Sequence, residues 1–137
     1  MDLGLNGKHA IVCASSRGLG KACATALARE GCDVIVNGRD VEHLSATADE
    51  IARICGHRPR TVQADLNTAD GRAALLAACA APDILVTNNA GPPPGMLGDW
   101  DRAAWISALE ANLLAPIELI SAVVGGMCER RFGRIVN

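Results

Sequence analysis

The sequence predicts an α/β fold of three layers, with a doubly wound parallel sheet between two layers of helices. Three observations predict it. Short apolar runs rich in β-branched residues alternate with longer segments of helical period, the connections are short, and the runs are almost uninterrupted by polar residues. Such alternation indicates βαβ units with right-handed crossovers. Continuous apolar strands are typical of a parallel sheet that helices cover on both faces.

Each expected strand is an apolar run, and the expected helices have recognisable ends. Glycines follow the first two helices, as is common at helix C-termini. Asn67 or Thr68 can cap the third helix, a Pro/Gly loop follows at 91–98, and Pro116 can begin the last helix. The expected strands are 9–13, 33–37, 60–64, 83–88 and 133–137, and the expected helices are 17–30, 40–55, 67–82, 99–114 and 116–131.

Length and composition indicate a globular chain without a charged partner. The 137 residues are 50% hydrophobic and 20% charged, without a repeat or linker. Lys and Arg total 13 against 15 Asp and Glu, a net charge of −2 that favours neither nucleic acid nor an anionic membrane. The longest apolar run, 73–81, is too short to span a bilayer, and the N-terminus lacks a signal-peptide pattern.

Residues that could hold a metal or form disulfides show no such pattern. The six cysteines include no C-x-x-C pair and the three histidines are scattered, so we expect no metal site. Most of the cysteines fall at apolar positions, which predicts buried, reduced thiols and a cytoplasmic protein. The chain has no tyrosine, so a mechanism with a tyrosine acid or base is excluded for this chain alone.

The most informative segment, 13–21, has the sequence CASSRGLGK and lies where the first strand turns into the first helix. A helix N-terminus offers free N–H groups to a phosphate, and Gly18 and Gly20 allow a close approach. A glycine pair at this position indicates dinucleotide binding. The alternative is an ordinary turn at a helix start. A P-loop matches poorly, because Ala22 stands where Ser or Thr is needed and Ser15 where the first glycine is needed.

This segment resembles the short-chain dehydrogenase/reductase family, whose motif is T-G-x-x-x-G-x-G. Gly18 and Gly20 correspond to its last two glycines, whereas Cys13 and Ala14 replace its Thr-Gly pair. We expect the methyl group of Ala14 to shift the turn or weaken cofactor binding. Within the family, the sequence is most similar to reductases of the 3-oxoacyl-carrier-protein type.

Further segments extend the resemblance along the whole chain. Asp65-Leu66 is similar to the family's pair near the adenine ring, 88–91 matches its N-N-A-G motif, and Asn112 matches the Asn of its Asn-Ser-Tyr-Lys tetrad. The segment 133–137 matches the strand before the catalytic Ser. The resemblance therefore implies a single, incomplete NAD(P)-binding Rossmann domain at 1–137, truncated after the start of the fifth strand, with the catalytic Ser, Tyr and Lys absent.

The resemblance and the glycine turn together assign candidate site residues. Asn112 is the catalytic candidate. The cofactor-binding candidates are Ala14, Ser16, Arg17, Gly18, Leu19, Gly20, Asn37, Arg39, Asp65, Leu66, Asn89, Ala90 and Gly91.

The end of the second strand favours NADP(H) over NAD(H). NAD-preferring folds usually have a carboxylate there, whereas this chain has Asn37-Gly38-Arg39. The guanidinium groups of Arg17 and Arg39 could clamp a 2′-phosphate. The alternative is that both arginines are solvated, with Asp40 pairing with Arg39.

The resemblance implies an NADP(H)-dependent oxidoreductase that acts on a small carbonyl compound or secondary alcohol, with this chain carrying the cofactor half. The alternative is a truncated, inactive protein that binds nucleotide or dimerises. The apolar face of helix 116–131, which includes Ile117, Ile120, Val124 and Met127, could form a homo-oligomer or simply cover the sheet. The run 91–95 could form a wall of the substrate cleft or a stiff turn.

Overall fold

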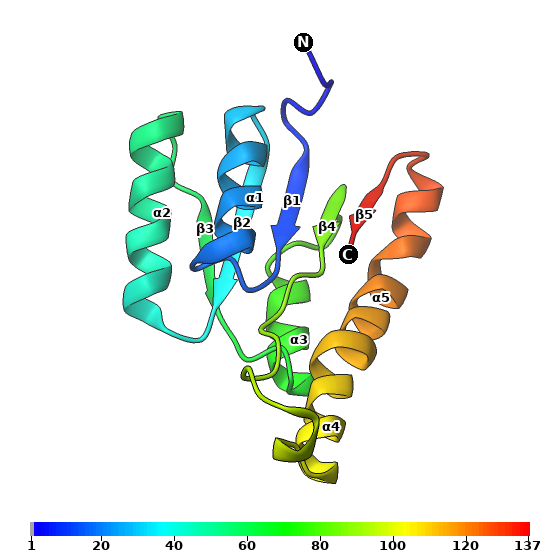
Figure 1. Ribbon diagram of the computed structural model, residues 1–137. Coiled ribbons are helices and arrows are strands. Elements are labelled where there is room, and N and C mark those ends of the chain that lie inside the picture. Colours follow the sequence, from blue (N-terminus) through cyan, green and yellow to red (C-terminus); the bar gives the residue numbers. More distant parts are fainter. Residues whose placement is uncertain (1) are drawn as a thin grey trace.

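A computed structural model describes residues 2–137 and confirms the predicted Rossmann-type architecture (Figure 1). Within these residues, the sheet has five parallel strands in the order β3-β2-β1-β4-β5. The strands are β1 (His9–Val12), β2 (Asp33–Gly38), β3 (Arg60–Gln63), β4 (Ile84–Val86) and β5 (Arg134–Val136). The helices are α1 (Gly18–Arg29), α2 (Val41–Cys55), α3 (Ala69–Ala77), α4 (Arg102–Leu109) and α5 (Ala115–Glu129).

Alternate residues of the central strands enter two separate cores, one on each face of the sheet. On β1, Ala10 and Val12 pack with α1 and α2, whereas Ile11 packs with α3 and α5. This alternation follows from the pleat of a strand, in which successive side chains point to opposite faces. All three β1 residues are fully buried, which explains the unbroken apolar run in the sequence.

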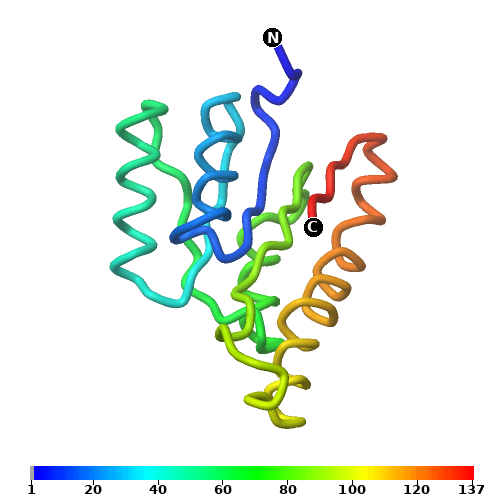
Figure 2. The backbone as a smooth tube through the Cα atoms, in the orientation of Figure 1, coloured from blue at the N-terminus to red at the C-terminus, as the bar shows by residue number. Residues whose placement is uncertain are grey.

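The strand order reverses between β1 and β4, because β2 and β3 lie on one side of β1 and β4 and β5 on the other. In such sheets, ligands bind beyond the carboxyl ends of the strands at this reversal. The strand β5, which ends the chain, lies beside β4 although about fifty residues separate them, as the backbone trace in Figure 2 shows. The crevice therefore lies where the segments after β1 and β4 meet.

The last two expected helices, 99–114 and 116–131, are one continuous helical segment from Arg102 to Glu129 (Figure 2). A π-helical turn, Glu110–Leu114, joins α4 to α5 and ends two residues before Pro116. Proline has no N–H and its ring clashes with the carbonyl four residues earlier, and a wide turn relieves both problems. The helix begins later than expected because Asp101 is its N-cap, accepting a hydrogen bond from the Ala104 N–H at 2.9 Å.

This continuous helix is long enough to cross a membrane, and an 18-residue stretch within it has a mean hydropathy of 1.6. We did not expect a helix of this length and hydropathy from the sequence, because scattered charged residues divide the segment into short apolar runs. Helices that cover the core of a globular protein can have the same length and composition. One face of α5 is buried against the sheet, formed by Ala115, Leu119, Val123 and Met127.

Helix α3 is shorter than expected and ends at Ala77 rather than Pro82. Thr68 is its N-cap, with Oγ1 accepting the Gly71 N–H at 3.0 Å. After Ala77, the N–H groups of Ala78 and Cys79 donate to carbonyls only three residues back. Pro82 also disfavours helical backbone in the preceding residue, so the chain leaves the helix early and enters β4.

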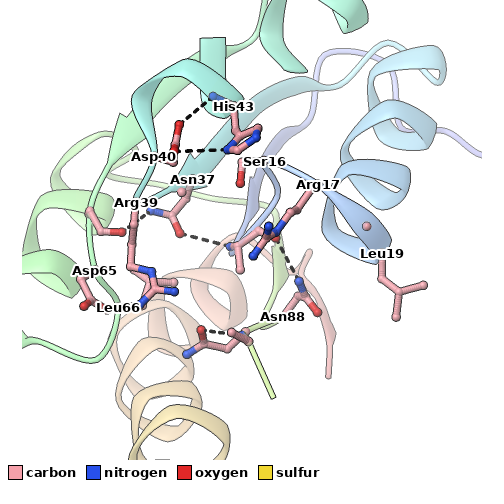
Figure 3. Close-up of a pocket in the computed structure, with 16 residues that line it drawn as sticks. Ser16, Arg17, Leu19, Asn37, Arg39, Asp40, His43, Asp65, Leu66 and Asn88 are labelled. Atoms are coloured by element: carbon pink, nitrogen blue, oxygen red, sulfur yellow. Dashed lines mark hydrogen bonds and ion pairs between the residues drawn. The ribbon is translucent and has the colours of Figure 1, made fainter. Parts of the chain in front are cut away.

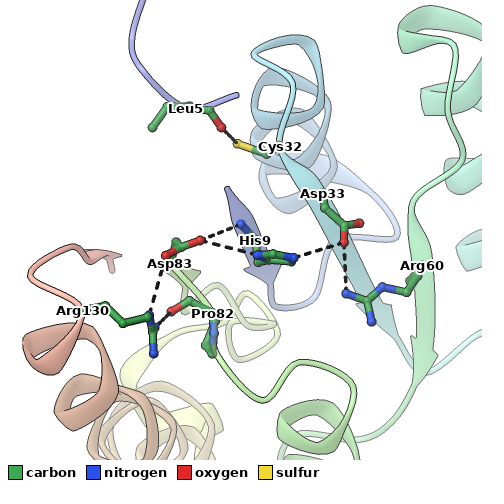
Figure 4. A network of polar contacts seen from close by, with 8 residues as sticks. All are labelled: Leu5, His9, Cys32, Asp33, Arg60, Pro82, Asp83 and Arg130. Atoms are coloured by element: carbon green, nitrogen blue, oxygen red, sulfur yellow. Dashed lines mark hydrogen bonds and ion pairs between the residues drawn. The ribbon is translucent and has the colours of Figure 1, made fainter. Parts of the chain in front are cut away.

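The amino ends of the strands are closed by a polar network, shown in Figure 4. The His9 ring lies between Asp33 and Asp83, with its nitrogens 3.8 Å and 3.6 Å from their carboxylate oxygens. Arg60 pairs with Asp33 at 3.3 Å, and Arg130 lies 3.9 Å from Asp83. These groups lie at the amino ends of the strands, on the opposite side of the sheet from the crevice at the carboxyl ends.

Candidate functional site

A cavity of about 460 Å³ lies at the carboxyl ends of the strands (Figure 3), within the range typical of ligand sites. The segments after β1, β2, β3 and β4 all contribute to its wall. Its lining residues are Ala14, Ser16, Arg17, Gly18, Leu19, Asn37, Gly38, Arg39, Asp40, His43, Ala64, Asp65, Leu66, Asn88, Asn89 and Ala90.

The glycines of the first turn have different structural roles. Gly18 begins α1 with a φ of +57°, a left-handed conformation that favours glycine. Gly20 is buried, and a Cβ there would lie 2.9 Å from Nδ2 of Asn88 and collide with the Ala14 carbonyl oxygen. Gly20 therefore sets the distance between α1 and the sheet, while Gly18 sets the backbone direction at the cavity.

The start of α1 faces the cavity without a side-chain cap. Its N-cap residue, Arg17, makes no side-chain hydrogen bond to the helix, and the first turn contains no acidic residue. The N–H groups of this turn and the positive end of the helix dipole are thus available to an anion. Since Gly18 and Leu19 line the cavity, an anionic group of a ligand could reach them.

Ala14 has a φ of +44°, in the left-handed region where a Cβ is unfavourable. It occupies the position at which the related motif has glycine, so the methyl group adds strain to this turn. Two hydrogen bonds hold the strained residue in place. Its N–H donates to Oδ1 of Asn37 at 3.1 Å, and its carbonyl accepts from Nδ2 of Asn88 at 3.1 Å.

Asn37 uses its side chain to hold the site together. Its side chain is almost fully buried, and besides accepting from Ala14, its Nδ2 donates to the carbonyls of Val62 and Ala64 at 3.1 and 3.2 Å. Ser15 adds a second link, because its Oγ accepts the Asn37 N–H at 2.9 Å. Asn37 lines the cavity, but these bonds show that its carboxamide organises the turns after β1 and β3.

Arg17 and Arg39 approach the cavity from opposite sides, one from α1 and the other from the end of β2 (Figure 3). Within residues 2–137, neither guanidinium forms an ion pair or a hydrogen bond. Asp40, the alternative partner for Arg39, instead caps α2, with its oxygens 2.9 Å from the His43 N–H and 3.3 Å from the His43 ring. The hydrogen bond from this N–H lowers the pKa of the Asp40 carboxyl.

The asparagines after β4 join the cavity wall to other elements. Asn88 donates to Ala14, as described, and Nδ2 of Asn89 donates to the carbonyl of Ala111 at 2.9 Å. On the neighbouring wall, Oδ1 of Asp65 accepts the Asn67 N–H at 3.0 Å, so this carboxylate is oriented by its own turn. The side chains after β3 and β4 are thereby held in fixed positions around the cavity.

Asn112 lies outside this cavity and lines a second one of about 560 Å³. The two cavities share Leu19, Asn88 and Asn89, so they adjoin at the reversal of strand order. Asn112 belongs to the π-helical turn, and its Nδ2 donates to the Ala108 carbonyl at 3.0 Å. The second cavity continues past it toward Asn137, whose Oδ1 accepts from Oγ1 of Thr87 at 2.6 Å.

The structure gathers most of the predicted cofactor-binding residues around one cavity. Gly20 and Gly91 are the exceptions, since neither lines it, and Gly20 lies behind the wall. The run 91–95 lines neither cavity; instead, Gly95 packs near the Trp100 ring. Residues that sequence reasoning did not assign also line the first cavity: Gly38, Asp40, His43, Ala64 and Asn88.

Among these, Asn88 could have been assigned from the sequence, since it begins the N-N-A-G segment. Asp40 and His43 lie beside the site because they form the N-terminal cap of α2. In the described part of the chain, no group of three or more His, Cys, Asp or Glu side chains is arranged to hold a metal ion.

Comparisons with known proteins identify the family of this fold. The family model for short chain dehydrogenase matches residues 8–137. The uncharacterized oxidoreductase YvaG of Bacillus subtilis (strain 168) is 35% identical over 137 residues, an alignment that covers 99% of this chain and 52% of that protein. The 3-oxoacyl-acyl-carrier-protein reductase FabG of Aquifex aeolicus (strain VF5) is 30% identical, with coverage of 100% and 57%.

Solved structures of oxidoreductases superpose on this chain. L-sorbose reductase from Gluconobacter frateurii, complexed with NADPH and L-sorbose, superposes with a TM-score of 0.89 at 29% identity, covering 98% of this chain and 53% of that chain. A metagenomic short-chain oxidoreductase in complex with NADP gives a TM-score of 0.83 at 35% identity, with coverage of 95% and 61%. The chain thus spans about half the length of the curated relatives that it matches.

Proposed function

Because the chain belongs to the short chain dehydrogenase family, we propose that it binds NADP(H) and forms the cofactor half of an oxidoreductase. The reaction would be hydride transfer between the nicotinamide and a small carbonyl compound or secondary alcohol. One observation carries the choice of NADP(H): Arg17 and Arg39 flank the cavity without ion-pair partners among residues 2–137, and the carboxylate of Asp40 is held by His43. Two free guanidiniums can bind a 2′-phosphate by charge-assisted hydrogen bonds.

The residues present fit a dinucleotide. The uncapped start of α1, with Gly18 in a left-handed conformation, can receive a diphosphate. Asp65 and Leu66 form the far wall, where we place the adenine end. The adjoining cavity, which contains Asn112, then receives the nicotinamide end and the substrate.

When bound, the cofactor supplies or accepts the hydride, and the chain supplies orientation. We propose that Ser16, Arg17, Leu19 and Arg39 contact the nucleotide, and that Asn37 keeps their turns in register. We propose that Asn112 holds a water molecule beside the reacting groups. The 137 residues contain no Tyr, and their only lysines are Lys8 and Lys21.

Titration of the purified chain with NADPH and with NADH tests this proposal. NADPH fluorescence should rise on binding, with a dissociation constant at least tenfold lower than that for NADH, as expected for one added charged contact. Equal or tighter binding of NADH would overturn the cofactor assignment. Failure of both to bind would overturn the nucleotide site itself.

A second candidate function is an inactive protein that binds nucleotide or dimerises. The observation in its favour is the outer face of α5, where Ile117 is 49% and Val124 is 39% exposed, while Met127 and the partly buried Ile120 pack toward the sheet. Oligomerisation through 116–131 would cover the exposed pair. Size-exclusion chromatography with light scattering distinguishes this: a strict monomer at high concentration would contradict it.

We also propose a cytoplasmic protein with no nucleic-acid or membrane partner. The cysteines of the described residues are all free thiols, and three of them are buried. The buried face of α5 favours a helix that covers the sheet over a membrane span.

A further inference from the structure

Arg72 of α3 is buried, with only 8% of its surface exposed, although its guanidinium carries a full charge. Arginine is rarely buried to this extent unless it is paired. Its Nη1 donates to the Leu66 carbonyl at 2.9 Å, its Nη2 lies 2.6 Å from Oε2 of Glu118, and Nη1 lies 3.5 Å from Oε1 of Glu110. Nε has no partner within residues 2–137, so the two Nη atoms make all of these contacts.

These contacts reach both of the adjoining cavities. Leu66 lines the first cavity, at the wall where we place the adenine end. Glu110 begins the π-helical turn that carries Asn112 into the second cavity. Helix α3 lies beside the start of α5 (Figure 1), so one side chain from α3 can hold both walls.

We propose that Arg72 is a positioning residue that couples the Leu66 turn to the π-helical turn, so that a nucleotide bound at Leu66 orders the turn carrying Asn112. This inference rests on the proposed function and deepens it. The coupling is physical, because a planar guanidinium with fixed donor directions can hold a carbonyl and two carboxylates at once.

Loss of the guanidinium should loosen both walls together. Without it, the Leu66 carbonyl loses a charged donor, and the carboxylates of Glu110 and Glu118 lose the cation that pairs with both. Lysine keeps the charge but not the forked geometry, so Arg72→Lys should restore only part of the coupling.

Hydrogen exchange of the free protein tests the coupling without any ligand. In Arg72→Met, the amides of 64–67 and of 111–115 should exchange at least tenfold faster than in the wild type, with Arg72→Lys intermediate. Arg58→Met is the matched control, since it removes an arginine whose Nε pairs with Asp49 at 2.8 Å on the surface. Faster exchange in only one segment, or in neither, would overturn the coupling.

If Arg72→Met does not fold, Glu110→Met removes one link while keeping Arg72 paired with Glu118. It should speed exchange in 111–115 and leave 64–67 unchanged. Unchanged exchange in 111–115 would overturn the role of Arg72 in holding the π-helical turn.

A nucleotide fragment then tests the functional consequence. Adenosine 2′,5′-bisphosphate should bind the first cavity and slow exchange in 111–115 of the wild type and of Arg58→Met, but not of Arg72→Met. Its affinity for Arg72→Met should fall about tenfold. Equal protection of 111–115 in Arg72→Met would overturn the inference. Failure of both the bisphosphate and NADPH to bind the wild type would overturn the proposed function. In that case, hydrogen exchange of the free protein decides whether Arg72 couples the two turns.

Discussion

Asn88 and Ala14, which are 74 residues apart in the sequence, are joined by a hydrogen bond from Nδ2 of Asn88 to the Ala14 carbonyl at 3.1 Å. The bond connects the ends of β4 and β1 at the reversal of strand order, where Asn88 lines both cavities. Gly20 packs directly against both partners. The first turn of α1 can thus lie this close to the Asn88–Ala14 bond only because Gly20 has no side chain.

Substitution of Gly20 should therefore disrupt this junction. In Gly20→Ala, the added Cβ would collide with the Ala14 carbonyl and the Asn88 amide, which we expect to lower the free energy of unfolding by about 1–3 kcal/mol. NADPH affinity should fall as well, since α1 must move. Urea unfolding and fluorescence titration measure the two effects.

Gly125→Ala is the matched control, because a Cβ at this exposed position of α5 meets nothing within 4 Å. It should raise the free energy of unfolding by about 0.5–1 kcal/mol. Two variants of equal stability would contradict the close packing at Gly20.

Ala14→Gly should relieve strain. The left-handed φ of +44° costs a residue with a Cβ about 1–2 kcal/mol, part of which the greater freedom of glycine in the unfolded chain offsets. We expect the free energy of unfolding to rise by about 0.5–1 kcal/mol and NADPH to bind more tightly.

The same replacement in a helix, Ala26→Gly at an exposed position of α1, should instead destabilise by about 0.5–1 kcal/mol. If both variants lose stability equally in urea unfolding, the strain at Ala14 is not relieved by glycine.

The proposed preference for NADPH should depend on the two arginines at the cavity. Arg17→Ala and Arg39→Ala should each raise the dissociation constant of NADPH by roughly tenfold or more, because each removes a charge-assisted hydrogen bond to the 2′-phosphate. Binding of NADH, which lacks this phosphate, should change little.

Arg53→Ala, in the last turn of α2, removes the same charge outside the cavity lining and should alter neither affinity. An equal loss of NADPH and NADH affinity in the cavity variants would assign the arginines a role other than cofactor discrimination.

Stability should fall at alkaline pH because of a buried thiol. Burial raises the pKa of Cys13 from 9.0 to about 12. Between these values the unfolded chain releases the thiol proton and the folded state keeps it, so the unfolded state gains stability as the pH rises from about 9. The free energy of unfolding should decrease over this range, as measured in urea under reducing conditions.

Cys13→Ala should reduce the slope of this decrease. Some pH dependence should remain, because burial also raises the pKa of Cys32. Cys128→Ala, at an exposed position, is the control and should keep the wild-type slope. Identical slopes in all three proteins would contradict a protonated Cys13 in the folded state.

Local patterns allowed much of the fold to be predicted. The apolar runs of β1 and β2 and the glycines after α1 and α2 act through nearest-neighbour sterics and side-chain period, so they are visible in the sequence. The prediction was wrong at two helix boundaries that lie close to a proline. The end of α3 was placed too late, and the helices around Pro116 were separated although a π-helical turn joins them.

The sequence by itself determined the order of strands and helices, the glycine turn and most of the residues around the first cavity, because these depend on short-range chemistry. Only the tertiary structure decided how those residues are used. Asn37 organises turns, Asn88 holds the Ala14 carbonyl, and Arg72 joins two walls through residues up to 46 positions away. Burial and hydrogen-bond partners arise from segments that meet only after folding, and no local pattern encodes those meetings.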